Sequence, residues 1–250
     1  MIKEERLIDY LKRNYKNYKT LLRNGSVLVD NKVVTKYDYL LKPNQEVTIN
    51  KYNKSKDIKI IYEDKDIIVV DKPYNLLTIS NGKEISLYNL VSEYVKKNNK
   101  NNKIFIVHRL DKDTSGLVVF AKNIKTKTYL QNNWSKVERR YIAVVVGKTK
   151  EKDILKNYLK ENKNHYVYVA NSGDLAITEY KKIKENDKYT WLDINIKTGK
   201  KNQIRVQLFN NKTPILGDKK YGCIKYKRLC LHAYKLVLLN KTFISEISFK

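Results

Sequence analysis

Short apolar runs separated by polar segments dominate the chain from residue 60 onward. Their length and their content of β-branched and aromatic residues are typical of strands. The runs are IKIIYEDKDIIVVDKP, KIFIVHRL, GLVVFAKN, RRYIAVVVG, LAITEYKKI, YTWLDINIKTG and NQIRVQLF. Helical periodicity occurs mainly at residues 87–97 and 126–137. Because the predicted strands outnumber the helices and do not alternate strictly with them, we expect an α+β fold with a mixed, mainly antiparallel sheet.

Residues 1–50 show a different pattern. Leu7, Ile8 and Leu11 recur at helical spacing, and YKTLLRNG indicates a second short helix that ends at Gly25. SVLVDNKVV predicts two strands joined by an Asp-Asn turn, and LLKPNQEVTI adds a turn and a further strand. We therefore expect a small α/β unit at the start of the chain.

The segment KYNKSKDIK, at residues 51–59, is polar, rich in lysine and free of apolar periodicity. It is interpreted as a linker, which divides the chain into domains at residues 1–50 and 60–250. The first domain carries basic residues near its second predicted helix, namely Lys16, Lys19 and Arg23.

The charge of the chain narrows the choice of partners. Its 250 residues include 52 Lys and Arg against 26 Asp and Glu, which gives a formal net charge of +26. Such a balance favours a protein that binds polyanions, and nucleic acid is the first partner to consider. The alternative is that the lysine content reflects composition bias on a solvated surface.

Cysteine and histidine give no indication of a metal site. Cys223 and Cys230 fit neither a disulfide framework nor a zinc motif, and the three histidines are far apart in sequence. The first residues are charged from the third position, unlike a signal peptide, and no apolar run approaches the roughly 18 residues that span a bilayer. We expect a monomer without membrane contact, in the cytoplasm or in an organelle whose targeting segment is absent here.

The loop HRLDKDTSG, at residues 108–116, lies between the apolar runs IFIV and GLVVFA. Its Asp111 directly follows the first apolar stretch, and a carboxylate at a partly buried strand end needs a cation or donors to stay ionised. Arg109 and Arg205 are the candidate cations. An aspartate held in this way would serve as a nucleophile or a base.

The end of this loop suits a tight turn. Hydroxyl and N–H groups of Thr114, Ser115 and Gly116 could point back at the carboxylate. An Asx-type turn that closes a hairpin explains the same residues equally well. None of the eight glycines lies in a dinucleotide-binding or P-loop motif, and the glycine-rich loop and DFG of protein kinases are missing.

The segment VHRLDKDTSGLVVFAKN resembles the signature of the RluA/RluD family of RNA pseudouridine synthases, which is HRLDxxTSG followed by an apolar strand. Six further stretches resemble motifs of this family in the same order along residues 60–235. They are IIVVDKPYNLLT, VERRYIAVVVG, LAITEY, IKTGKKNQIRVQL, PILGDKKYG and RLCLHA. The resemblance implies the pseudouridine synthase fold and the conversion of uridine to pseudouridine without a metal or an organic cofactor.

The resemblance also implies roles for four residues. Asp111 matches the catalytic aspartate, and Arg205 matches its buried ion partner. Tyr141 would pack against the target base, which an enzyme that works on a base must flip out of the RNA. Arg109 would fill the gap that the flipped uridine leaves in the RNA stack.

Several other basic residues are interpreted as RNA contacts, namely Lys72, Lys200, Lys19 and Arg23. Lys72 follows an apolar strand and is equally consistent with a solvated turn. The basic stretch at residues 121–140 fits a phosphate-binding surface, which we favour, or a solvated helix face. The chain departs from the family's motifs at Asn75, Lys200, Asn202 and Gln207. Because the tripeptide QIR remains, these departures are interpreted as changes in RNA or loop contacts.

Other polar residues of the motifs are interpreted as structural. Asp218 and Tyr221 favour a turn over a ligand-binding loop, and His108 and His232 favour hydrogen-bonded positions inside the fold.

Residues 1–50 resemble the S-four-type RNA-binding domain, chiefly through LLRNGSVLVDNKVV and LKPNQEV. The pair Asn44-Gln45 replaces the usual Gly-Asp at a turn where asparagine tolerates a positive φ. Family members with this leading domain act mostly on large-subunit ribosomal RNA, which is therefore the expected substrate. A transfer RNA substrate and a non-catalytic, RNA-binding ribosome-assembly factor are the alternatives.

Overall fold

The computed structural model describes most of the chain. The described ranges are 4–23, 26–49, 58–81, 84–222, 224–247 and 249. Cys223, Gly25 and residues 51–57 of the predicted linker lie outside them.

The first part of the chain contains two helices, α1 (Leu7–Asn14) and α2 (Tyr18–Arg23). Its strands are short and are β1 (Glu5–Arg6), β2 (Val27–Val29), β3 (Lys32–Val33), β4 (Leu40–Leu41) and β5 (Val47–Ile49). β2 lies between β3 and β5, and β1 pairs with β4. The predicted turn between β2 and β3 is present, since Asp30 and Asn31 have φ angles of 48° and 63°. Side chains of both helices and of three strands share one apolar cluster, which includes Leu7, Leu11, Leu22, Val27 and Leu41.

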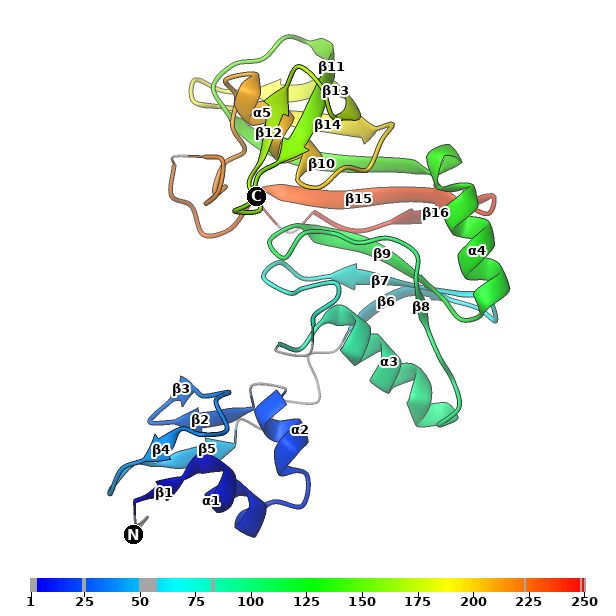
Figure 1. Ribbon diagram of the computed structural model, residues 1–250. Coiled ribbons are helices and arrows are strands. Elements are labelled where there is room, and N and C mark those ends of the chain that lie inside the picture. Colours follow the sequence, from blue (N-terminus) through cyan, green and yellow to red (C-terminus); the bar gives the residue numbers. More distant parts are fainter. Residues whose placement is uncertain are drawn as a thin grey trace.

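The rest of the chain is built around one large sheet (Figure 1). Its order is β12-β11-β13-β14-β10-β15-β9-β7-β6, with β16 paired to β15 and β8 paired to β9. The strands are β6 (Lys59–Glu63), β7 (Ile67–Lys72), β8 (Phe105–Ile106), β9 (Ser115–Ala121), β10 (Glu138–Val146), β11 (Lys152–Glu161), β12 (Val167–Ala170), β13 (Asp174–Glu185), β14 (Tyr189–Ile196), β15 (Leu231–Leu238) and β16 (Lys241–Ile244). Among the described strands of this sheet, only β15 and β9 pair in parallel. The predicted α+β fold with a mainly antiparallel sheet is confirmed.

The parallel pairing of β9 with β15 depends on Gly116, the last residue of the signature loop. Its φ is 114°, and a Cβ at this position would lie 2.2 Å from the backbone oxygen of Ala233 in β15. Only glycine allows this conformation and this close approach without strain. The glycine therefore joins the two halves of the sheet directly beside the loop that contains Asp111.

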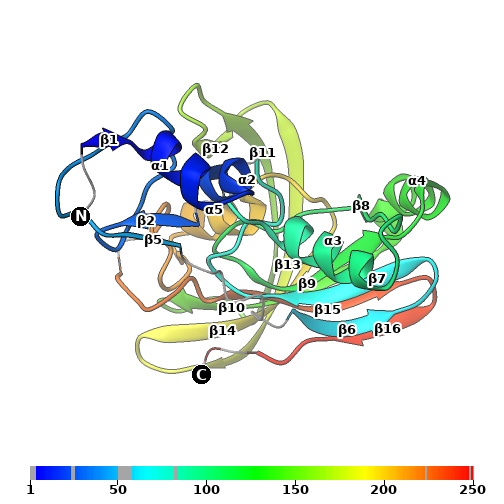
Figure 2. The same cartoon turned by 90° about the horizontal axis from the view of Figure 1, so that it is seen from below.

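Three helices pack on this sheet: α3 (Leu87–Asn98), α4 (Ile124–Asn132) and α5 (Gln203–Asn210). Figure 2 shows α3 and α5 on the same side of the sheet, and apolar side chains of both join the larger core cluster. Leu130 of α4 belongs to a second cluster. Side chains of Ser86 and Asn123 cap the starts of α3 and α4. None of the helices described here is long and apolar enough to cross a membrane.

The prediction of a strand at NQIRVQLF is wrong, because this segment forms α5. Ile204, Val206 and Leu208 alternate with polar residues, which is the pattern of a half-buried strand. In the structure the intervening Arg205 and Gln207 are buried as well. Both find polar partners inside the protein. Residues 203–208 of the helix are all buried, so this part of the sequence shows no helical periodicity.

Candidate active site

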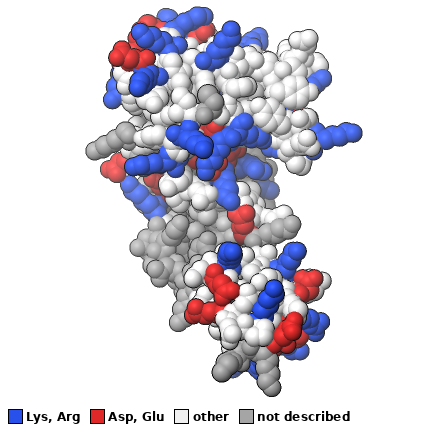
Figure 3. All heavy atoms as spheres, turned by 90° about the vertical axis from the view of Figure 1, so that its left-hand side faces the viewer, with Lys and Arg blue, Asp and Glu red and all other residues white. Residues whose placement is uncertain are grey.

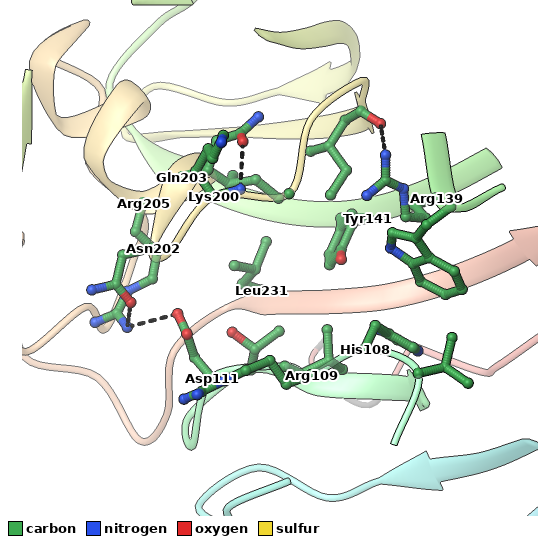
Figure 4. A pocket seen from close by; sticks show the side chains of 17 residues that line it. His108, Arg109, Asp111, Arg139, Tyr141, Lys200, Asn202, Gln203, Arg205 and Leu231 are labelled. Atoms are coloured by element: carbon green, nitrogen blue, oxygen red, sulfur yellow. Dashed lines mark hydrogen bonds and ion pairs between the residues drawn. The ribbon is translucent and has the colours of Figure 1, made fainter. Parts of the chain in front are cut away.

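A pocket of about 290 Å³ opens beside the loop between β8 and β9. Its walls come from this loop, from β10, from the segment between β14 and α5, and from α5 itself. Figure 4 shows Asp111 and Arg205 on one side of Tyr141 and Arg139 on the other. The volume is close to the lower end of the range for small-molecule pockets, about 300–1,000 Å³, and so suits one nucleobase better than a large cofactor.

Asp111 and Arg205 meet at one end of this pocket, as the sequence predicts. Nη1 of Arg205 lies 3.2 Å from Oδ2 of Asp111. The guanidinium is nearly buried, while the Asp111 side chain is 26% exposed and borders the pocket. The pair therefore orients the Asp111 carboxylate at the edge of the cavity.

The main partner of Arg205 is Asp218, which the sequence did not identify in this role. Both oxygens of Asp218 accept bonds of 2.8 Å, one from Nε and one from Nη2 of Arg205. Although burial opposes the charge of each group, these bonds raise the pKa of Arg205 and lower that of Asp218. Asp218 also accepts from the backbone N–H groups of Lys220 and Tyr221, as expected for a turn residue. Bidentate pairing fixes the plane of the guanidinium and thereby the direction from which it reaches Asp111.

Tyr141 lies in β10, and its ring forms part of the pocket wall. The side chain is nearly buried, and burial raises the pKa of its phenol to about 12. The hydroxyl therefore stays protonated at neutral pH. An aromatic face at this position can stack on a planar base.

Arg139 lines the other end of the pocket with Trp134 and His108. The rings of Trp134 and His108 stack at 4.5 Å, and the Arg139 guanidinium lies 5.8 Å from the Trp134 ring. Nε2 of His108 accepts a bond from the Val119 N–H, and burial, aided by the charge of Arg139, lowers the pKa of His108 to about 3. This histidine is therefore a neutral structural residue, as predicted. Arg139 and Tyr141 are two residues apart on β10, so their side chains point to the same face of the sheet. This spacing could have predicted that Arg139 lines the pocket with Tyr141, but the sequence analysis interpreted residues 121–140 as a basic surface.

Comparison with known proteins decides the family. The model of the RNA pseudouridylate synthase family matches residues 66–210. The chain belongs to this family. A relative from Borreliella burgdorferi, named ribosomal large subunit pseudouridine synthase D, is 35% identical over 76% of this chain and 65% of its own length, which is less than two thirds of the relative. A protein of the same name from Buchnera aphidicola subsp. Acyrthosiphon pisum is 32% identical over 83% of this chain and 71% of its own length.

A solved structure with the same fold is the human RNA pseudouridylate synthase domain containing 4. It superposes with a TM-score of 0.66 at 21% identity, over 76% of this chain and 88% of that chain. At this identity the likeness concerns the fold alone. The family-model match begins after residues 1–65, so it does not include the segment that resembles an S-four-type domain.

Lys72 does not lie on the surface of the protein. The prediction that it contacts RNA is therefore wrong. Its side chain is fully buried at the end of β7. The ammonium donates to the backbone oxygens of Pro73, Leu76 and Lys112 at 2.7–3.0 Å. Burial lowers the pKa of Lys72 to about 7. Because Lys112 follows Asp111, this bond holds the loop that presents the carboxylate.

Three other predicted RNA contacts lie where solvent reaches them. Arg109 is exposed at the edge of the pocket, and Lys200 lines it while it pairs with Asp174. Lys19 is exposed on α2, whereas the Arg23 side chain lies outside the described residues. Figure 3 shows Lys and Arg side chains gathered across the middle of one face of the molecule. Exposed lysines also follow Asp218 in the chain, namely Lys219, Lys220, Lys225 and Lys227.

The basic stretch at residues 121–140 is less available to phosphate than its sequence suggests. Lys122 pairs with Glu63, Arg139 is buried, and Arg140 pairs with Asp193. Part of this charge is therefore already neutralised or inside the protein.

The hydroxyl of Ser115 does not point at Asp111, contrary to expectation. It bonds to Nδ1 of His232 at 2.8 Å and accepts from Arg228. Nε2 of His232 lies 3.1 Å from the hydroxyl of Ser245. The prediction of His232 as a hydrogen-bonded core residue is confirmed, and Ser115 fastens the end of the loop to β15 and to Arg228 in the segment before it.

Proposed function

We propose that this protein isomerises uridine to pseudouridine in RNA. The observation that carries the proposal is the Asp111 carboxylate, held by Arg205 at one end of a base-sized pocket that Tyr141 lines. A buried pocket of this kind requires the target nucleotide to leave the RNA stack. Arg109 would occupy the gap, and its exposed position at the pocket edge supports this role.

The chemistry needs an ionised carboxylate beside the C1′ atom of the target. The N1–C1′ bond of the nucleotide breaks, the uracil turns within the pocket, and C5 bonds to C1′. Asp111 can attack C1′ as a nucleophile or remove a sugar proton as a base. Both routes use the carboxylate of Asp111, which Arg205 holds by a hydrogen bond.

The proposed substrate is large-subunit ribosomal RNA. Two relatives carry ribosomal large subunit in their names. The net charge of +26, Lys200 at the pocket and the exposed lysines that follow Asp218 favour a long, structured polyanion.

The test begins with the reaction and its position. Carbodiimide adducts, detected as reverse-transcription stops, would show a pseudouridine in ribosomal RNA of wild-type cells that is missing from cells without the gene. Asp111→Asn should fail to restore it, because the amide is neither a nucleophile nor a base, while RNA affinity should stay within a few fold. Asp113→Asn, from the same loop, is the matched control and should restore the modification. Full activity of Asp111→Asn would refute the proposal.

We also propose that residues 1–50 form a separate S-four-type RNA-binding domain, and that a linker joins it to a catalytic domain. The predicted boundary of the catalytic domain at residue 60 moves to Lys59, because β6 begins there. The apolar cluster shared by α1, α2 and the first strands supports this division, and the exposed Lys19 supports RNA contact. Deletion of residues 1–50 should weaken RNA binding by about tenfold or more and leave the turnover rate at saturating RNA nearly unchanged. Unchanged affinity would contradict the proposed role.

A further inference from the structure

Arg139 is a second guanidinium of the pocket, and it differs from Arg205 in having no counterion among the described residues. Its residue is only 5% exposed. Nε donates to the Val137 oxygen, and Nη2 donates to the oxygens of Ile196 and Lys197, at 3.1–3.3 Å. No described carboxylate lies within ion-pair distance of it. Buried charges in proteins are usually paired, so an unpaired one beside a cavity indicates a ligand that completes it.

The third nitrogen of this guanidinium, Nη1, lies beside Gly199 at the pocket. A Cβ built on Gly199, which lines the pocket, would lie 3.0 Å from it. No acceptor for Nη1 is found among the described residues. Trp134 and three backbone oxygens hold the group in place, so Nη1 is a fixed donor at the end of the cavity opposite to Asp111 (Figure 4).

The geometry of uracil matches this arrangement in both states of the proposed reaction, on which the inference rests. With N1 bonded to C1′ beside Asp111, the ring atom opposite to N1 is C4, and its oxygen O4 points to the far end of the pocket. After the ring turns and C5 bonds to C1′, the opposite atom is C2, and O2 takes the place of O4. A carbonyl oxygen therefore faces the far end before and after the turn.

We propose that Arg139 binds this carbonyl oxygen through Nη1, which makes it a specificity-determining and charge-stabilising residue for uridine. A guanidinium donates and never accepts, so it matches O4 of uracil and rejects the amino group that cytosine carries there. When the N1–C1′ bond breaks, its electron pair stays on the ring and is shared by N1, O2 and O4. The pair returns when C5 bonds to C1′, C5 releases its proton, and N1 takes one up. A preorganised cation at the carbonyl stabilises this transient charge.

The first measurement is the single-turnover rate of Arg139→Gln on a synthetic RNA that contains the mapped uridine. The rate should fall by about 100-fold, because one donor to a developing anion is lost, while RNA affinity stays within a few fold. Arg140→Gln is the matched control. It is the next residue of β10, its guanidinium pairs with Asp193, and it does not line the pocket. Its rate should stay within a few fold of wild type.

A substrate cycle separates contact with the base from a purely structural role. Replacing the target by 4-thiouridine puts sulfur, a weaker acceptor, in place of O4. The wild-type rate should fall by about tenfold, whereas the rate of Arg139→Gln should not fall further, because the contact is already lost. Products are separated as nucleosides by chromatography after digestion. Arg139→Met, which has no donor, carries the same comparison should the glutamine variant fail to fold.

The outcomes distinguish the two proposals. If wild type modifies uridine but the sulfur substitution slows wild type and variant by equal factors, Arg139 does not contact O4 and this inference is overturned. If wild type forms no product from the mapped uridine, the proposed function fails and the inference fails with it. Coupling of fivefold or more between the two changes supports the contact.

Discussion

Two buried cations, one on α5 and one on β7, hold the loop of Asp111, and they do so by different interactions. On the α5 side, Arg205 bonds to two carboxylates, those of Asp111 and Asp218. On the β7 side, Lys72 bonds to three backbone oxygens, and no described carboxylate lies within ion-pair distance of it. Both cations are buried, yet the pKa of Arg205 is raised and that of Lys72 is lowered to about 7. Arg205 thus orients the carboxylate by charge, whereas Lys72 fixes the backbone beside it by dipoles.

The two cations should differ in how their charge depends on pH. Arg205 keeps its charge at every pH at which the protein is folded, because its partners are anions and guanidinium is a very weak acid. Lys72 has only carbonyl partners and can lose its proton near neutral pH while still donating two bonds. The orientation of the Asp111 carboxylate should therefore depend on Arg205 and Asp218. The stability of the loop should depend on Lys72.

Asp218→Asn tests the first side and should have the largest effect on stability. The change leaves the buried Arg205 guanidinium without its bidentate partner, and breaking a buried ion pair costs about 3–5 kcal/mol. Urea unfolding measures the free energy, and pseudouridine formation should fall with it.

An exposed ion pair provides the control for this change. Asp174→Asn removes the partner of Lys200, where both side chains are more than a third exposed, and should cost at most about 1 kcal/mol. If Asp218→Asn costs no more than Asp174→Asn, charge pairing does not hold the α5 side of the loop.

Lys72→Met tests the other side and should cost about 3 kcal/mol at pH 8. It leaves buried oxygens of Pro73, Leu76 and Lys112 without their donor, and each unsatisfied group costs about 1–3 kcal/mol before relaxation. The turnover rate should fall more than RNA affinity, because the loop of Asp111 loosens. Lys112→Met removes only an exposed pair with Glu84 and should change the unfolding free energy by less than about 1 kcal/mol.

The same two sides show how far the sequence could predict the site. The order of the motifs predicted that Asp111, Arg205 and Tyr141 belong to one active site. This was possible because each residue lies in a motif that can be recognised by its residue types, even when the motifs are far apart in the chain. Helix α5 was missed because burial of Arg205 and Gln207 removes the polar face that marks a surface helix.

Lys72 and Asp218 show the corresponding limit for single residues. A lysine after a strand is usually solvated, and only coordinates reveal three converging carbonyls around it. Asp218 belongs to a turn motif, and nothing in its neighbours along the chain indicates a bidentate bond to a helix 13 residues earlier. Pairings between distant segments depend on packing, which local patterns do not specify.

The pH dependence of stability sharpens the contrast between the two cations. The pKa of Lys72 is about 7 in the folded protein and about 10.5 in the unfolded chain, chiefly because of burial, with the charges of Asp111 and Asp113 opposing it. Between these values the unfolded state binds more protons, so raising the pH stabilises the folded state. The unfolding free energy of wild type should rise by about 2 kcal/mol relative to Lys72→Met from pH 7 to pH 9. A constant difference over this range would show that Lys72 stays charged.

Asn75→Gly tests whether the turn beside Lys72 is held by the conformation of Asn75 or by the Lys72 ammonium. This change should have the smallest effect on the free energy of unfolding. Asn75 has a φ of 59°, between the two turn residues, Pro73 and Leu76, whose oxygens bind Lys72. Glycine relieves the left-handed conformation but gains freedom in the unfolded chain, and these opposing effects of up to about 1 kcal/mol should leave a net change below about 0.5 kcal/mol. Turnover should be unchanged. A loss above about 1.5 kcal/mol would mean that Asn75 itself fixes the turn, whereas a neutral result beside a destabilised Lys72→Met would assign that task to the buried cation.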